Sequence, residues 1–229
     1  PTYITDSLQG ILDAATTGAG HGAVMNVDVP GVGSWSGGAG DAISGITVGQ
    51  PQTPALGNEK FRVGSISKVF MATCFFMLEE NGTLDLTDTI GLYLRPTLIT
   101  DTIQSSAPVT IENLLSHTSG INNSSDNISC QMDAVSDLTR FFSMEEAVYC
   151  GASMGEEFTP GTSMDYSNTN FTSLAMILES STGIDYWTFV QDSIINPLGL
   201  LDTKVPAGDT ILSAHMGCYW NMPPMVDFT

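Results

Sequence analysis

The sequence predicts an α+β fold, in which a small antiparallel sheet near the N-terminus accompanies a larger, mostly helical region. Residues 23–29 alternate between apolar and polar side chains, which is typical of a half-buried strand. Residues 33–39 form a second candidate strand after a Pro-Gly turn signal, so the pair predicts a β-hairpin. Helical segments dominate from Ser65 onward. We therefore expect an N-terminal part at residues 1–64 and a mostly helical part at residues 65–229.

The N-terminal part begins with an expected amphipathic helix from Ile4 to Ala15, which carries its apolar side chains on one stripe. Residues 42–59 contain glycine and proline throughout and are predicted to form a loop, and residues 61–63 are predicted to be extended. A two-stranded hairpin cannot cover a layer of helices by itself. We therefore expect further strands of this sheet to come from elsewhere.

The helical part contains segments with recognisable start and stop signals. The most apolar one runs from Ser65 to Glu80 and ends at an Asn-Gly pair. Residues 122–130 are expected to be a polar loop. The other predicted helices are residues 111–116 with Thr110 as cap, a helix capped by Ser143 with Glu145 and Glu146 in its first turn, residues 168–181 ending at Gly183, and a helix capped by Asp185 that stops before Pro197.

The charge balance excludes several function classes. The chain has 6 basic and 25 acidic residues, a net charge of −19, whereas proteins that bind nucleic acids or anionic membranes need a basic face. With 42% hydrophobic residues, the chain is too apolar to be disordered. The longest apolar run, residues 69–78, is much shorter than the roughly 20 residues of a membrane span. We expect neither nucleic-acid binding nor membrane insertion.

The cysteines and histidines do not have the spacing of a metal site, so no metal or other cofactor is expected. Cys74 lies among phenylalanines and is expected to be a buried free thiol. Cys130 and Cys150 flank a loop-rich segment, and whether they form a disulfide or remain free thiols stays open. The shortage of lysine fits an exported or a salt-adapted protein, and we expect an exported one, periplasmic or extracellular.

The first candidate site is residues 64–68, Gly-Ser-Ile-Ser-Lys, at the start of the most apolar helix. Ser65 is expected at or near the N-cap, and Lys68 follows three residues later on the same face. A serine hydroxyl needs an adjacent base to act as a nucleophile, and a lysine in an apolar pocket can transfer protons. The alternative is a capping serine beside a solvent-exposed lysine.

A second candidate is residues 165–168, Asp-Tyr-Ser-Asn. Tyr166 beside a lysine can act as a base, and Asn168 can donate an amide hydrogen to a substrate carbonyl if the segment is extended. The alternative is a tyrosine in the core and an asparagine N-cap. Ser116 and His117 suggest a triad, but we interpret His117 as a capping or buried structural histidine at a helix end. We expect no nucleophile elbow of the α/β-hydrolase type.

In combination and order, these motifs resemble the serine β-lactamase and DD-peptidase superfamily, specifically its class C β-lactamase branch. That branch also holds D-alanyl-D-alanine carboxypeptidases, family VIII esterases and D-aminopeptidases. The resemblance extends from about Gly22 to Gly217. The segments that carry it are residues 61–68 with the SxxK motif, 79–88, 114–121 with Leu-Leu-Ser-His-Thr-Ser-Gly-Ile, 160–161 with the following YxN motif at 166–168, 197–200 and 202–203.

The resemblance implies a β-lactamase/transpeptidase-like fold and a serine hydrolase that forms an acyl-enzyme on an amide or ester: a β-lactam, a D-Ala peptide or a short ester. It implies that Ser65 is the nucleophile and that its backbone N–H forms half of the oxyanion hole. Lys68 and Tyr166 would share proton transfer, and Asn168 would orient the substrate. The alternative is a catalytically inactive relative that serves as a binding or scaffold protein.

The sequence departs from the family pattern at the third motif, Lys-Thr-Gly or His-x-Gly on a sheet strand. Residues 215–217 read His-Met-Gly, but they correspond better to another family segment. We therefore expect the C-terminal strands and the third motif to be absent from this chain, which looks truncated before that motif. A second chain or fragment would then supply them, and this chain alone would be inactive or poorly folded.

Overall fold

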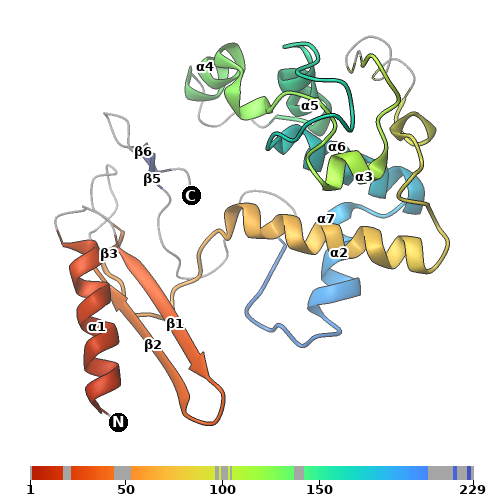
Figure 1. Ribbon diagram of the computed structural model, residues 1–229. Helices are drawn as coiled ribbons and strands as arrows, with labels where there is room; N and C mark the ends of the chain where they lie inside the picture. Colours follow the sequence, from red (N-terminus) through yellow and green to blue (C-terminus); the bar gives the residue numbers. More distant parts are fainter. Residues whose placement is uncertain are drawn as a thin grey trace. The chain divides into compact units, whose positions relative to one another are not determined.

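The computed structural model describes residues 2–17, 22–43, 53–95, 98, 103, 105–136, 142–205, 219–220 and 226–227. The chain forms two compact units (Figure 1). One, here called the hairpin unit, comprises residues 1–63 and 206–229; the other, the helical unit, comprises residues 64–205. The expected division had a single break after residue 64, whereas the structure groups residues 206–229 with the first unit.

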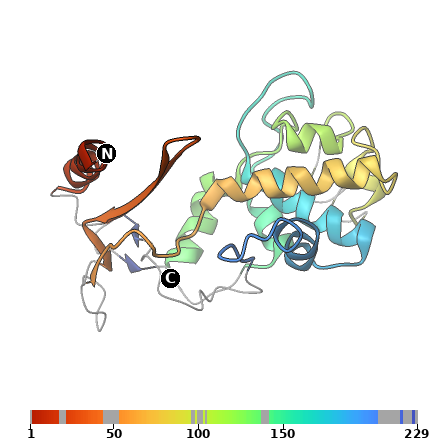
Figure 2. The ribbon, with the colours of Figure 1, turned by 90° about the horizontal axis from the view of Figure 1, so that it is seen from below.

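The hairpin unit contains helix α1 (Thr2–Thr16) and the antiparallel strands β1 (Ala23–Val29) and β2 (Gly33–Ala39). Helix α1 packs against the hairpin, mainly on β2, as the two ribbon views show (Figures 1 and 2). The Gln9 side chain supports this packing by donating a hydrogen bond to the Gly38 carbonyl at 3.1 Å. The predicted helix and hairpin are therefore confirmed.

Two further pairs of strands were not predicted. Strand β3 (Asp41–Ile43) pairs with β4 (Thr53–Pro54), and β5 (Tyr219–Trp220) pairs with β6 (Val226–Asp227), both antiparallel. The predicted loop at residues 42–59 was therefore wrong at its β3 and β4 positions. Strands of two or three residues are too short to show an alternating pattern, so sequence periodicity cannot reveal them.

The helical unit surrounds helix α6, which packs against α2, α3, α5 and α7. Helix α2 is the long orange-to-yellow helix in both views (Figures 1 and 2). The elements are η1 (Gly64–Ile66), α2 (Ser67–Glu80), η2 (Ile90–Leu92), α3 (Ile111–Leu115), η4 (Ser124–Asp126), α4 (Ile128–Ser136), α5 (Met144–Ala152), α6 (Asn168–Thr182), α7 (Tyr186–Val190) and the π-helical turn η5 (Gln191–Ile195). None of the helices among the described residues is long and apolar enough to cross a membrane.

Local capping explains several of these boundaries. Thr110 and Asn113 form a capping box at the start of α3, and Ser143 and Glu146 form one at α5. Helix α6 ends at Gly183, whose φ of 71° places it in the left-handed conformation that favours glycine at helix ends. Asp185 occupies the N-cap position of α7 without a capping side-chain hydrogen bond.

Helix α4 begins at Ile128 and was not predicted, so the polar loop predicted at residues 122–130 is wrong at its end, residues 128–130. Asn127 caps α4, because its Oδ1 accepts hydrogen bonds from the N–H groups of Ser129 and Cys130 at 3.0 and 3.2 Å. A disulfide between Cys130 and Cys150 then joins α4 to α5. The question that the sequence left open is therefore answered in favour of a disulfide, which stabilises a helix with a weak apolar pattern.

Cys74 is the buried free thiol that the sequence predicted. Burial raises the pKa of this thiol to about 11, so it remains protonated at neutral pH and is a packing residue rather than a nucleophile. It belongs to the core of the helical unit together with Phe75, Leu114 and Leu174, all of which are fully buried.

Candidate active site

Ser65 lies in the 3-10 turn η1, one residue before the N-cap of α2, which is Ile66. The expected place of Ser65 at or near the N-cap is therefore confirmed, whereas the alternative of a capping serine is wrong, because no side chain caps the start of α2. Gly64 has a φ of 55°, and Ser67 Oγ donates a hydrogen bond to the Gly64 carbonyl at 2.7 Å. This turn leaves the Ser65 hydroxyl available for contacts outside its own helix.

Lys68 lies in the first turn of α2 and reaches two of the other candidate residues. Its Nζ donates a hydrogen bond to Asn168 Oδ1 at 2.7 Å and another to Ser65 Oγ at 3.3 Å. The ammonium also lies 4.9 Å from the ring centre of Tyr166 and 5.4 Å from that of Phe171. The expected apolar pocket is thus formed on one side by aromatic rings, while oxygen atoms surround the other side.

Tyr166 completes the contact around the serine, because its Oη lies 2.7 Å from Ser65 Oγ. Burial raises the pKa of Tyr166, but the contact with Lys68, the hydrogen bond with Ser65 and the positive charge of Lys68 together hold it below its usual value. A lowered pKa favours the phenolate, which is the form that accepts a proton. The hydroxyl of Ser65 therefore has two proton-transfer groups within reach.

Asn168 is the first residue of α6 and not part of the extended segment that the sequence suggested. Its Oδ1 accepts from Lys68, while its Nδ2 donates to Ser125 Oγ at 3.0 Å. Its backbone N–H donates to Asn123 Oδ1 at 3.0 Å. Sequence reasoning missed Asn123 and Ser125, because both lie in the segment predicted to be a featureless polar loop.

His117 is not part of a serine triad. The neighbouring Ser116 Oγ donates to the Glu112 carbonyl at 2.7 Å, which satisfies that hydroxyl within its own helix. The His117 ring instead packs on the Tyr166 ring, with centres 4.6 Å apart. Burial lowers the pKa of His117, as does the charge of Lys68, and both outweigh the opposing effect of Asp165. His117 thus contacts a residue of the candidate site, which the structural role expected from the sequence did not include.

The letters Gly-x-Ser-x-Gly of a nucleophile elbow do occur at residues 151–155, a match that sequence reasoning missed. An elbow requires a turn between a strand and a helix. Ser153 is instead the C-cap of α5, and its Oγ faces the Cys150 carbonyl at 3.5 Å. The match therefore carries no chemistry. The His215–Gly217 segment, the weak third-motif candidate, lies outside the described residues.

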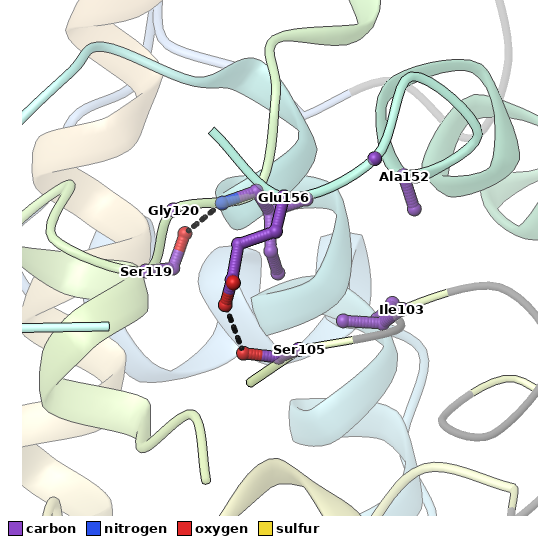
Figure 3. A pocket seen from close by; sticks show the side chains of 8 residues that line it. Ile103, Ser105, Ser119, Gly120, Ala152 and Glu156 are labelled. Carbon is purple, nitrogen blue, oxygen red and sulfur yellow. Dashed lines mark hydrogen bonds between the residues drawn. The ribbon is translucent and has the colours of Figure 1, made fainter. Parts of the chain in front are cut away.

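A small pocket lies apart from these residues, between Ile103, Ser119, Ala152 and Glu156 (Figure 3). Glu156 Oε1 is already satisfied, because it accepts hydrogen bonds from Ser105 Oγ at 2.9 Å and from the Ser106 N–H at 2.8 Å. These contacts also lower the pKa of the Glu156 carboxyl. None of the candidate site residues lines this pocket, and the carboxylate in its wall is already bonded to its neighbours.

Comparison with known proteins agrees with this geometry. A family model described as Beta-lactamase matches residues 15–228. Penicillin-binding protein 4* of Bacillus subtilis (strain 168) is 32% identical over 161 residues, which cover 66% of this chain and 32% of that protein. Protein flp of Staphylococcus aureus (strain COL) is 28% identical over 150 residues, which cover 63% of this chain and 28% of that protein. The matched regions thus span about a third of these relatives.

Solved structures give the same result. A D-stereospecific amidohydrolase from Streptomyces sp. superposes with a TM-score of 0.79 at 28% identity, over 98% of this chain and 64% of that one. The D-amino acid amidase from Ochrobactrum anthropi SV3 complexed with L-phenylalanine amide gives 0.76 at 25% identity, over 98% and 61%. Because the family model matches nearly the whole chain, and relatives and structures agree with it, the chain belongs to the beta-lactamase family of the serine β-lactamase and transpeptidase superfamily.

Proposed function

We propose that this chain carries the nucleophile and the proton-transfer groups of a serine hydrolase, with Ser65 as the nucleophile. The observation that carries the proposal is the convergence at Ser65 Oγ of Tyr166 Oη at 2.7 Å and Lys68 Nζ at 3.3 Å. A hydroxyl held by two such groups has both an acceptor for its proton and a positive charge to stabilise the alkoxide. An inactive scaffold has no need for this arrangement.

In the proposed reaction, Ser65 Oγ attacks the carbonyl carbon of an amide or ester and forms a C–O bond. The proton of Ser65 passes to the Tyr166–Lys68 pair, which we treat as one coupled unit because its members interact directly. The same pair returns the proton to the leaving amine or alcohol as the carbonyl–leaving-group bond breaks. Water then hydrolyses the acyl-enzyme and regenerates the serine.

Two further groups would hold the substrate. The backbone N–H of Ser65, at the start of α2, would donate to the developing oxyanion, a position that the helix dipole favours. Asn168 would donate from its amide to a substrate carbonyl, since its side chain is held beside Lys68 and Ser125. We propose that a strand outside these residues, in the same protein or in a second chain, supplies the other oxyanion donor.

As the substrate class, we propose amides of D-configured amino acids. Two structures that are similar over almost the whole chain are named as a D-stereospecific amidohydrolase and a D-amino acid amidase. β-Lactams, D-Ala peptides and short esters react by the same steps and are the alternatives within the class C-like branch. We also propose an exported protein, which the Cys130–Cys150 disulfide supports, because disulfides persist in oxidising compartments.

The test is direct labelling of the serine. The protein is incubated with a fluorophosphonate and, separately, with a fluorescent penicillin, and the modified peptide is identified by mass spectrometry. We expect the label on Ser65 and not on the nearby Ser67, the first residue of α2, whose hydroxyl is bonded to the Gly64 carbonyl. Hydrolysis of D- and L-phenylalanine 4-nitroanilide is then compared. Absence of any label on Ser65 contradicts the proposal.

Variants assign the roles. Ser65→Ala should abolish labelling, and Lys68→Ala should slow it by roughly 10²–10⁴-fold, as loss of an acid–base group does. Lys204→Ala is the matched control, since Lys204 is an exposed lysine of the same unit outside the site. Near-normal labelling of the Lys68 variant contradicts its assigned role.

A further inference from the structure

We propose that His117 is a positioning residue for Tyr166, acting through two separable contacts: its ring supports the phenol, and its Nδ1 fixes the backbone that carries it. The proposal rests on the proposed function, because Tyr166 matters there as a proton-transfer group. It assigns to His117 no contact with substrate. The position of Tyr166 makes such support necessary, since its side chain is 42% exposed and residues 163–167 form no regular structure.

The first contact is between rings. His117 and Tyr166 have ring centres 4.6 Å apart at an interplanar angle of 38°, and Phe171 packs on the His117 ring at 5.3 Å. Phe171 belongs to α6, the central helix of the unit. The imidazole therefore lies between a side chain of the well-packed helix α6 and the exposed phenol of Tyr166. Through this contact the helix fixes where the Tyr166 ring lies.

The second contact is with the backbone. The Ser167 N–H donates to His117 Nδ1 at 3.2 Å, and the Asp165 N–H donates to the His117 carbonyl at 3.0 Å. His117 thus binds the residues on both sides of Tyr166. Asn168, whose side chain is proposed to bind the substrate, follows Ser167 directly. The same contact therefore also fixes the backbone position of Asn168.

A buried chain of hydrogen bonds determines which ring nitrogen accepts. The Ile121 N–H donates to Ser119 Oγ at 3.1 Å, and that hydroxyl donates to Asn170 Oδ1 at 2.7 Å. The Asn170 Nδ2 group therefore faces His117 Nδ1, at 3.5 Å. Ser119 and Asn170 are buried. Two donors consequently point at Nδ1, which leaves the ring proton on Nε2.

The surroundings keep the ring neutral. A proton on Nδ1 would face the donors of Ser167 and Asn170, and the resulting charge would lie close to the ammonium of Lys68. The charged and titratable groups around the ring are Lys68 of α2 and Asp165 and Tyr166 of the segment before α6. Burial and Lys68 lower the pKa of His117 in spite of Asp165.

Two substitutions separate the contacts. His117→Asn keeps an acceptor close to the position of Nδ1, removes the ring and suits the local φ of 60°, which asparagine tolerates. His117→Phe keeps a ring and removes the acceptor. We expect each to lower kcat for ester hydrolysis by about 10²-fold with little change in KM, because a displacement of about 1 Å costs that much. Rates are divided by the amount of Ser65 that fluorophosphonate labels, so that a smaller fraction of folded protein does not lower the measured rate.

A second readout does not depend on activity. The titration of Tyr166 is followed by its phenolate absorbance, with Tyr166→Phe as the reference, in the parent protein and both variants. We expect the pKa of Tyr166 to rise toward its usual value in both variants, because the phenol moves away from Lys68 and Ser65. Nitrogen NMR of the parent should show His117 Nδ1 unprotonated at neutral pH.

The outcomes distinguish the two proposals. If both variants keep the parental Tyr166 titration and the parental rate per labelled serine, the positioning role is overturned. If the variants only melt earlier, with unchanged rate and titration, His117 is a stabilising residue and the proposal is likewise overturned. If Ser65 of the parent takes no label while the Tyr166 titration shifts as expected, positioning stands and the proposed function fails.

Discussion

The two units of the chain differ in how much interior each one encloses. The helical unit buries several large apolar side chains completely, among them Phe75, Leu114 and Leu174. Among the described residues of the hairpin unit, the buried apolar side chains are Leu12 and three alanines, Ala39, Ala42 and Ala55. A large buried side chain contributes about 1.5–3 kcal/mol, and an alanine contributes far less. The stability of the described structure therefore resides mainly in the helical unit.

The candidate site follows the same division. Ser65, Lys68, Tyr166 and Asn168 all belong to the helical unit, on or beside α2 and α6. Precise positioning requires rigid supports, because small displacements of catalytic groups reduce rates strongly. The comparison indicates that the candidate site lies in the better-packed unit.

The largest expected difference is between two equal truncations. Leu174→Ala, at a side chain with no exposed surface in the helical unit, should cost about 2–5 kcal/mol of unfolding free energy. Leu12→Ala, at a side chain that is 5% exposed in the hairpin unit, should cost less, because the other buried apolar side chains described in that unit are alanines. Urea unfolding followed by circular dichroism measures both values. Equal costs contradict the proposed division of stability.

The next effect concerns the disulfide. Replacing both Cys130 and Cys150 by serine should cost about 3 kcal/mol, as expected for a closed loop of this length. The disulfide joins α4 to α5, and the turn η4 before α4 carries Ser125, which holds Asn168. The loss should therefore also weaken substrate binding, seen as a higher KM. Dithiothreitol should reproduce the effect in the parent and change nothing in the double variant.

Replacing a glycine by alanine is expected to change the unfolding free energy in opposite directions in the two units. Gly64→Ala should destabilise the helical unit by roughly 1–2 kcal/mol, because its φ of 55° is unfavourable for alanine even though there is space for the methyl group. Gly10→Ala in α1, where the methyl group also meets open space, should stabilise by up to about 1 kcal/mol. Only the first should also reduce labelling of the adjacent Ser65. If both substitutions change the unfolding free energy in the same direction, the backbone conformation of the two glycines does not explain their effects.

The features that could be predicted from sequence are those encoded within a few residues. The hairpin at 23–39 and the helix caps Thr110 and Ser143 required only local patterns, and the structure confirms them. Helix α4 was missed because it depends on a disulfide, and the strand pairs β3–β4 and β5–β6 were missed because strands of two or three residues are too short to show an alternating pattern. Their own sequences carry little periodicity.

The site shows the same limit. The residue types of Ser65, Lys68 and Tyr166 indicated serine chemistry, because few other roles need that combination at those positions. The supports of the site could not be inferred in this way. Ser125 and the Nδ1 contact of His117 lie far along the chain from the residues that they hold, and their role follows from packing alone.

The smallest expected effect concerns surface charge. Arg95 forms an ion pair with Glu145 in the first turn of α5, and the two side chains are 64% and 49% exposed. Water screens such a pair, so its coupling energy should lie below about 1 kcal/mol and decrease with salt. A double-mutant cycle with Arg95→Met and Glu145→Gln measures it. A coupling energy above about 2 kcal/mol in this chain, whose net charge is −19, would show that ionic contacts rather than the apolar core hold α5 in place. The difference in apolar burial between the two units would then no longer explain where the stability of the chain lies.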